Sequence, residues 1–342
     1  MDAVEIKRLL KAAGAFKSGI ALAGEVDADR MADYDRWLSE GRHATMSYLE
    51  KYNDIRRNPA LLLPGARSMI SSVFNYWWGR SDGPLQWASY ALGDDYHDVV
   101  RARLQSVADM IVNQTGAECR VCVDTAPIPE RYWAVKSGIG FIGLNRQLIV
   151  PGAGTHFFLG EIVTTLPLTP DQPETGNCGE CRRCLSACPG GALSPEGLDA
   201  NRCLSYLTIE HRGDFPTEVS GNPTDPHTPT APHTPTAHHT LSDPLTPADH
   251  HTPAYITTTR PNIRLGRHIY GCDVCQDVCP HNRFAPISEI EEFRPRPAIL
   301  RLDTEAIISM KQEEFSTLFR RSAIKRTKLT GLQRNATAIH KE

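Results

Sequence analysis

The sequence contains no apolar run that approaches the length of about 20 residues needed to cross a membrane. Its first eight residues, Met1-Asp-Ala-Val-Glu-Ile-Lys-Arg, include neither an apolar signal core nor a twin-arginine pair. It also lacks an excess of positive charge, because its formal net charge is −3. These absences exclude a membrane-spanning protein and a polycation that binds nucleic acid over its whole surface. They predict a protein of the reducing cytoplasm.

With 342 residues and 40% hydrophobic content, the chain can bury a substantial core in one to three domains. Eight of its ten cysteines fall into two runs and one single position. The first run, Cys178 to Pro189, has the C-x2-C-x2-C-x3-C-P spacing that wraps a cubic iron–sulfur cluster. The second run, Cys272 to Pro280, lacks the first thiolate of that pattern, because Ile269 stands in its place.

Cys203 is the available replacement for the missing thiolate. In two-cluster ferredoxins the fourth cysteine of a run serves the other cluster. The sequence therefore predicts two neighbouring [4Fe-4S] clusters, one held by Cys178, Cys181, Cys184 and Cys279 and the other by Cys188, Cys203, Cys272 and Cys275. A pair of four-cysteine zinc sites is the alternative, since zinc also takes C-x2-C pairs. The x2-x2-x3 spacing and the proline after each last cysteine favour clusters.

Segments typical of helices and strands alternate up to about residue 169. Apolar periodicity predicts helices over residues 6–13, 31–52, 94–114 and 127–137. Runs of apolar and β-branched residues predict strands over 68–75, 119–123, 147–150 and 157–165. This order predicts a layered α/β or α+β domain over residues 1–170.

Three patterns in this domain imitate known motifs. Residues 138–143 match G-x-G-x-x-G, but they follow a helix pattern and not the strand that a dinucleotide site requires. Cys119 and Cys122 have redox spacing, yet on a strand they point to opposite faces. Asp95 and His97 suggest an acid–histidine relay, although Asp95 would also suit a helix cap.

Residues 171–290 form the predicted two-cluster domain, and segment 213–259 interrupts it with nine Pro, twelve Thr and six His. Such a composition cannot bury a core and predicts a disordered or polyproline-like insertion, whose histidines are a candidate loose metal site. Residues 291–342 form a predicted helical segment that ends in a basic stretch without acids. The stretch contains Arg320, Arg321, Lys325, Arg326, Lys328, Arg334 and Lys341, with a smaller basic group at Arg260, Arg264, Arg267 and His268. Both are candidate nucleic-acid surfaces or simply solvated charge.

Further motifs occur in a defined order. They are Ala91 to His97, Val123 to Pro127 with Glu130 and Arg131, Gly138 to Gly143 with Asn145, Phe158 to Glu161, both cysteine runs, Cys203 to Thr208, Ile269 to Asp273, and Arg334 to Ala336. In this order they resemble the epoxyqueuosine reductase family, which comprises cobalamin- and iron–sulfur-dependent enzymes of tRNA modification. The resemblance covers nearly the whole chain apart from the insertion.

The resemblance implies a nitroreductase-like cobalamin-binding domain, a ferredoxin-like domain that delivers electrons, and a short helical C-terminus. It implies reduction of epoxyqueuosine to queuosine at the wobble position of tRNA anticodons. We also expect an unidentified electron donor as a partner and a monomeric protein. It implies that Asp124 donates a proton. It places Arg56, Tyr96, His97, Leu148, Leu159, Ser205 and Asp273 around the corrin or the active-site cavity.

A proton donor near neutral pH needs a raised pKa, which an apolar cavity would give to Asp124, whereas local sequence alone also permits a helix cap there. The chain departs from the family at Leu144, where lysine is usual, and lacks a helical repeat extension. No D-x-H-x-x-G motif is present, because Val100 follows where glycine belongs. A cobalamin would therefore lack a lower histidine ligand from that motif. The alternatives are a ferredoxin-type electron carrier and a corrinoid reductase resembling reductive dehalogenases.

Overall fold

The computed structural model of the protein describes residues 1–215 and 264–342. The predicted insertion therefore lies outside the described residues from position 216 onward. Among the described helices, none is long and apolar enough to cross a bilayer.

A four-stranded antiparallel sheet forms the centre of the N-terminal part, with strand order β1-β2-β7-β4. The strands are β1 (Lys17–Leu22), β2 (Ser68–Asn75), β7 (Phe157–Thr164) and β4 (Cys119–Cys122). The last three fall where strands are predicted. The sequence did not predict β1, because Gly19 and three polar or small neighbours weaken its apolar pattern. Glycine is required there, since a Cβ would lie 1.9 Å from the Ser137 carbonyl oxygen.

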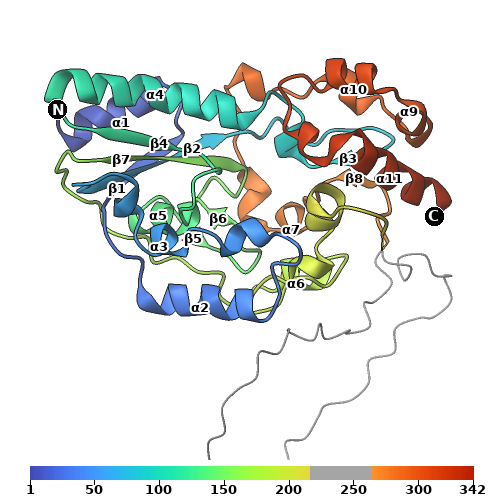
Figure 1. The fold of residues 1–342 in the computed structure, drawn as a ribbon, viewed down its shortest axis with the longest axis horizontal. Coiled ribbons are helices and arrows are strands. Elements are labelled where there is room, and N and C mark those ends of the chain that lie inside the picture. The colour runs from blue at the N-terminus through green and yellow to red at the C-terminus, as the bar shows by residue number, and fades with distance from the viewer. Residues whose placement is uncertain (216–263) are drawn as a thin grey trace, which may run out of the picture.

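Helices cover both faces of this sheet (Figure 1). On one face lie α1 (Ala3–Ala12) and α4 (Tyr96–Thr115), which pack on alternate residues of β7 such as Phe158 and Ile162. On the other face lies α5 (Glu130–Lys136), near Val163. The layered α+β architecture follows from this alternation, because successive strand residues point to opposite faces.

The predicted long helix over residues 31–52 is wrong in its second half. Helix α2 (Ala28–Ser39) ends early, and Gly41 adopts a left-handed backbone with φ +65°. A 3-10 turn (Ser47–Glu50) and the short α3 (Asn53–Arg57) follow. The apolar periodicity of the sequence continues beyond Ser39, so it did not indicate where the helix ends. The left-handed turn at Gly41 ends α2 there.

The two-cluster domain contains α6 (Arg183–Ala187) and α7 (Val274–Asp277), which carry cysteines of the two runs. Two small sheets flank the core: β3 (Gln86–Trp87) pairs with β8 (His268–Tyr270), and β5 (Phe141–Ile142) pairs with β6 (Leu148–Ile149). The C-terminal helices are α8 (Pro297–Leu300), α9 (Thr304–Ser309), α10 (Gln312–Leu318) and α11 (Lys328–Lys341).

The C-terminal helices share one hydrophobic core with two earlier parts of the chain. Trp87, Ile269 and Phe319 are all buried in it. Residues 291–342 therefore pack against segments from both preceding regions, and the two termini lie at opposite ends of the molecule (Figure 1). This packing fixes the basic C-terminal stretch to the same body as the cysteines.

Candidate active site and cysteine groups

Asp124 lies in the loop that follows β4. Its backbone has φ +52°, a left-handed conformation that aspartate tolerates better than most residues. Its backbone N–H donates to Glu130 Oε1 at 2.6 Å, so the first residue of α5 holds the loop. The Asp124 side chain is 55% exposed, which leaves its carboxylate open to a substrate.

His97 connects this loop to the start of α4. Asp95 is the N-cap of α4 and accepts from the His97 backbone N–H at 3.1 Å. The same Asp95 oxygen lies 2.7 Å from His97 Nδ1, and His97 Nε2 lies 3.1 Å from Asp124 Oδ2. The helix cap and the acid–histidine relay, which the sequence offered as alternatives, therefore occur together.

Tyr96 completes the contact set around Asp124. Its side chain hydrogen-bonds Asp124, and its ring stacks on Phe158 with centroids 4.4 Å apart. Three residues predicted to share the active site, Tyr96, His97 and Asp124, are thus brought into direct contact. Phe158 on β7 supports them from the sheet.

The charges in this contact set differ from the expectation. Burial lowers the pKa of His97, but hydrogen bonds to Asp124 and Asp95 outweigh it and raise the pKa to about 9. Desolvation raises the pKa of Asp124, yet the hydrogen bond and positive charge of His97 lower it below its ordinary value. The expected raised pKa of Asp124 is therefore wrong in this structure. At neutral pH the proton resides on His97, and Asp124 is its anionic partner.

Two further carboxyls, for which the sequence predicted no role, lie behind the loop. Glu161 on β7 is fully buried, and neither of its carboxyl oxygens has a hydrogen-bond partner among the described residues. Burial and the neighbouring Glu130 raise its pKa well above the ordinary value. Desolvation and the charge of Asp124 raise the pKa of Glu130 to about 8. The sequence signal that could have indicated a buried carboxyl is the glutamate within the largely apolar strand 157–164.

The Glu161→Gln variant is expected to remove a pH dependence from protein stability. Glu161 stays protonated in the folded protein while an unfolded chain ionises it above a pKa of about 4.5, so stability falls as pH rises above that value until the raised folded pKa is reached. Each such proton contributes a slope of about 1.4 kcal/mol per pH unit. Denaturant midpoints measured from pH 5 to 8 should show a flatter dependence for the variant. A variant slope equal to that of the wild type would show that Glu161 ionises in the folded state.

Four of the eight motif cysteines lie together on α6 and around it. Burial and the neighbouring sulfurs of Cys178 and Cys279 raise the pKa of Cys184. Burial and the sulfurs of Cys178 and Cys181 likewise raise the pKa of Cys279. The backbone N–H of Leu144 donates to Cys178 Sγ at 3.4 Å. The first group is therefore Cys178, Cys181, Cys184 and Cys279.

The other four motif cysteines form a second group. Burial raises the pKa of Cys272 to about 12, with the sulfurs of Cys203 and Cys188 as further causes. Burial and the same two sulfurs raise the pKa of Cys275. The backbone N–H of Ala192 donates to Cys188 Sγ at 3.2 Å, as amides do toward thiolates of iron–sulfur clusters.

The donor chemistry of both groups fits iron–sulfur clusters. Each group supplies four thiols, and backbone N–H groups donate to Cys178 Sγ and Cys188 Sγ, as amides do toward cluster thiolates. Among residues 1–215 and 264–342, no three His, Cys, Asp or Glu side chains are arranged to hold a single metal ion.

The other predicted site residues occupy three separate places. Ser205 hydrogen-bonds Cys203 in the second cysteine group, and Asp273 accepts from the Ser89 backbone N–H at 2.7 Å. Leu148 and Leu159 belong to one apolar cluster beneath α5. Arg56 lies over the Tyr34 ring, 5.0 Å from its centroid, and its buried Nε has no partner among the described residues. None of these three places shares a hydrogen bond with Asp124.

The glycine-rich segment 138–143 and the Cys119/Cys122 pair, which imitate known motifs, have structural roles. Gly138 follows the end of α5 with φ +72° and packs against the Gln172 carbonyl, so the glycine-rich segment begins no nucleotide-binding helix. Cys122 is buried between β4 and α5, and Cys119 bonds Thr164 Oγ1 at 3.4 Å. Both cysteines lie outside the two groups.

The contact of Asp124 with His97 and the two four-cysteine groups are together typical of an iron–sulfur oxidoreductase. Comparison with known proteins agrees: residues 56–125 match the family described as epoxyqueuosine reductase QueG, DUF1730, and residues 177–225 match the 4Fe-4S double cluster binding domain. The chain is 34% identical to an epoxyqueuosine reductase of Leadbetterella byssophila, over 98% of this chain and 97% of that protein. It is 33% identical to one of Synechocystis, over 94% of this chain and 99% of that protein. The chain belongs to the epoxyqueuosine reductase family.

Solved structures show the same fold. An epoxyqueuosine reductase crystallised with an epoxyqueuosine-modified tRNA-Tyr stem loop superimposes with a TM-score of 0.79 at 26% identity, over 98% of this chain and 80% of that chain. The Bacillus subtilis enzyme, solved with an aspartate-bearing catalytic loop swung out of the active site, gives the same values. The protein is therefore an oxidoreductase with a double [4Fe-4S] domain.

Proposed function

We propose that this protein reduces epoxyqueuosine to queuosine at the wobble position of tRNA anticodons, with electrons passing through two [4Fe-4S] clusters to cobalamin. The observation that carries the proposal is the contact of Asp124 with His97 in a member of this family. Asp124 has a positive φ and a half-exposed side chain on a loop. A catalytic loop bearing an aspartate is also described for the Bacillus subtilis relative. The protein acts as a monomer in the cytoplasm and takes its electrons from a separate donor.

The reaction sets the number of protons that the site must deliver. Converting an epoxide to an alkene and water consumes two electrons and two protons. Asp124 points its carboxylate outward and holds His97 in its charged form, so a proton can pass from His97 Nε2 through Asp124 to the leaving oxygen. Asp95 keeps the ring oriented by its bond to Nδ1. Asp124 is therefore the proposed proton donor, with His97 as the group that recharges it.

The two cysteine groups are the proposed cluster ligands. Cys178, Cys181, Cys184 and Cys279 would hold one cluster, and Cys188, Cys203, Cys272 and Cys275 the other. The amide donors to Cys178 and Cys188 stabilise thiolate charge at each site. Leu144 contributes its backbone to the first cluster, so the replacement of the usual lysine leaves that contact intact.

The residues proposed to surround the corrin offer suitable chemistry. The buried Nε of Arg56 has no partner among residues 1–215 and 264–342, and an amide or phosphate oxygen of cobalamin would satisfy it. Leu148 and Leu159 provide an apolar surface, and Ser205 and Asp273 lie at the second cysteine group. Bound cobalamin would supply the reducing chemistry that the epoxide requires.

The testing experiment is anaerobic reconstitution followed by assay on tRNA. Protein reconstituted with iron, sulfide and cobalamin should retain about eight irons and one cobalt. Given reduced methyl viologen and tRNA carrying epoxyqueuosine, it should yield queuosine, detected by mass spectrometry of the digested nucleosides. Eight irons without cobalt or product would instead indicate an electron carrier, and zinc without iron would overturn the assignment.

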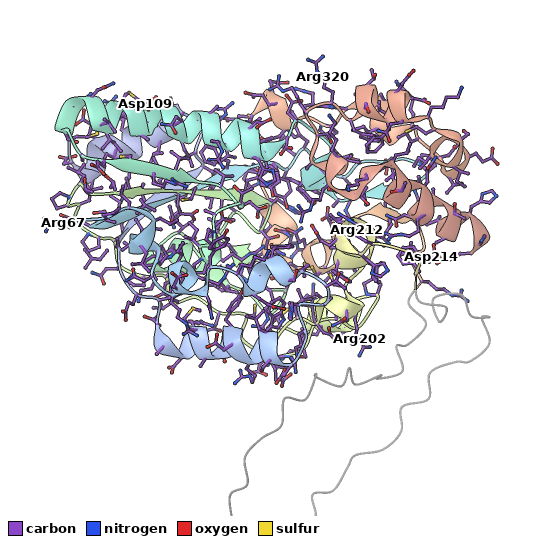
Figure 2. The ribbon with its side chains drawn as sticks, viewed as in Figure 1. Arg67, Asp109, Arg202, Arg212, Asp214 and Arg320 are labelled. Carbon is purple, nitrogen blue, oxygen red and sulfur yellow. The ribbon has the colours of Figure 1, made fainter. Side chains whose placement is uncertain are left out.

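The basic C-terminal stretch is the proposed phosphate-binding surface. Arg320 is exposed at the upper edge of the molecule (Figure 2). Arg321 lies 3.5 Å from Asp94, and Arg326 forms a bidentate pair with Glu210 at 2.8 Å. The exposed cations of this stretch, Arg320, Arg321, Lys325 and Arg326, are therefore the side chains most available to the phosphates of the tRNA backbone.

Neutralising Arg320, Arg321, Lys325 and Arg326 to alanine should weaken tRNA binding at low salt by about tenfold or more, since each lost phosphate contact lowers the salt dependence of log K by about 1. Filter binding from 50 to 200 mM salt measures both effects. A matched control neutralises four other exposed cations: Arg8 and Lys11 of α1, Arg120 of β4, and Arg67, which Figure 2 labels. Equal affinity of both variants would place the RNA elsewhere.

A further inference from the structure

An arginine-lined cavity of about 980 Å³ opens beside Cys279. Arg80, Arg183 and Arg283 line it, and Asp277 is the acid on its wall. Of the eight grouped cysteines only Cys279 lines it. The cavity therefore lies next to the first cysteine group and is not the place of that cluster itself.

Two of the three cavity arginines form no ion pair among the described residues, and a neighbouring aromatic side chain is exposed. Arg80 lies 3.8 Å from Asp277, but neither Arg183 nor Arg283 forms an ion pair within the described parts of the chain. Next to Arg283, the Phe284 side chain is 79% exposed, with the guanidinium 5.8 Å from its ring centroid. Arginine and an exposed aromatic are enriched at protein–protein contacts.

The two cysteine groups differ in what they adjoin. The first group has Cys279 on the wall of the open cavity, and its chain neighbours Glu180 and Arg182 are exposed. The second group adjoins the proposed corrin residues Ser205 and Asp273. Electrons from outside would therefore enter at the first group and move on to the second.

We propose that the surface formed by Arg80, Arg183, Arg283 and Phe284 docks an acidic ferredoxin, which delivers electrons to the cluster held by Cys178, Cys181, Cys184 and Cys279. This inference rests on the proposed cluster ligands. In each encounter the reduced centre of the ferredoxin loses one electron and the cluster gains it. Two encounters supply the two electrons that one epoxide consumes.

Charge and chemistry favour a redox protein over RNA as the occupant. Both would be attracted to the arginines, because positive patches steer any polyanion. The cluster ligand Cys279 on the cavity wall gives a docked carrier a short path for its electron, which RNA does not need. Phe284 adds an apolar anchor that suits a protein surface.

The test uses anaerobically reconstituted protein and a purified acidic plant-type [2Fe-2S] ferredoxin as the probe. The variant Arg183→Glu/Arg283→Glu should bind reduced ferredoxin at least about tenfold more weakly at low salt and accept its electrons about tenfold more slowly in stopped flow. Cluster reduction by dithionite and queuosine formation driven by dithionite should be unchanged, which separates a docking defect from failure of the proposed function. A control with equal charge change, Arg8→Glu/Arg120→Glu, changes exposed residues of α1 and β4 at the other end of the molecule (Figure 1).

Iron content decides whether the charge-reversed variant is usable, because Arg183 adjoins Cys184. If it loses iron, Phe284→Ala gives the same test, with a smaller expected loss in ferredoxin affinity. Unchanged ferredoxin binding and electron-transfer rate in iron-replete variants would overturn the proposal. Weaker tRNA binding with an unchanged ferredoxin rate would also overturn it and assign the surface to RNA.

Discussion

Asp124→Asn is expected to lower the rate of queuosine formation by about 10²–10⁴-fold, the range that one positioned proton donor contributes. The amide has nearly the same shape and can still bond His97, but it cannot carry a proton between Nε2 and the leaving oxygen. Single-turnover assays on epoxyqueuosine-containing tRNA under excess reductant measure the effect without interference from tRNA release. The variant should retain its iron, its cobalt and its tRNA affinity.

Two comparisons sharpen this result. Asp98→Asn, which changes an exposed acid one residue beyond His97 on α4, should leave the rate unchanged. In the wild type the rate should fall as pH rises through about 9, where His97 loses its proton, and the fall should move to lower pH in Asp124→Asn because one bond that raises the pKa of His97 is weakened. Wild-type turnover by Asp124→Asn would remove Asp124 from the mechanism.

Cys203→Ala is expected to abolish queuosine formation and to lower the iron content of reconstituted protein from about eight to about four. Cys203 lies outside both cysteine runs, yet its sulfur neighbours those of Cys188, Cys272 and Cys275. Removing it leaves one cluster with three thiolates beside the proposed corrin residues. Iron and acid-labile sulfide analyses measure the loss.

The matched control for this prediction is Cys119→Ala, a cysteine of β4 that bonds Thr164 and belongs to neither group. It should keep about eight irons and full activity. If Cys203→Ala also kept eight irons, the second cluster would have a different fourth ligand. If Cys119→Ala lost activity with full iron content, the defect would lie in folding of the sheet domain.

The sequence by itself determined the features that depend on local spacing. The short intervals among Cys178, Cys181 and Cys184 predict that these three thiols share a cluster, and the pattern of two-cluster ferredoxins assigns Cys188 to the other one. Periodicity placed α4 and the strands β2 and β7 correctly, because each buries one regular face. The motif order also carried the family resemblance, which the comparisons bear out over nearly the full chain.

Only the tertiary structure decided the chemistry at Asp124. His97 and Asp124, 27 positions apart, meet because α4 begins where the loop after β4 passes. That contact lowers the pKa of Asp124, opposite to the expectation from an apolar cavity. Glu130 and Glu161 acquire raised pKa values only where α5 covers β7. Protonation depends on which charges and donors surround a group in space, and sequence spacing contains that information only for near neighbours.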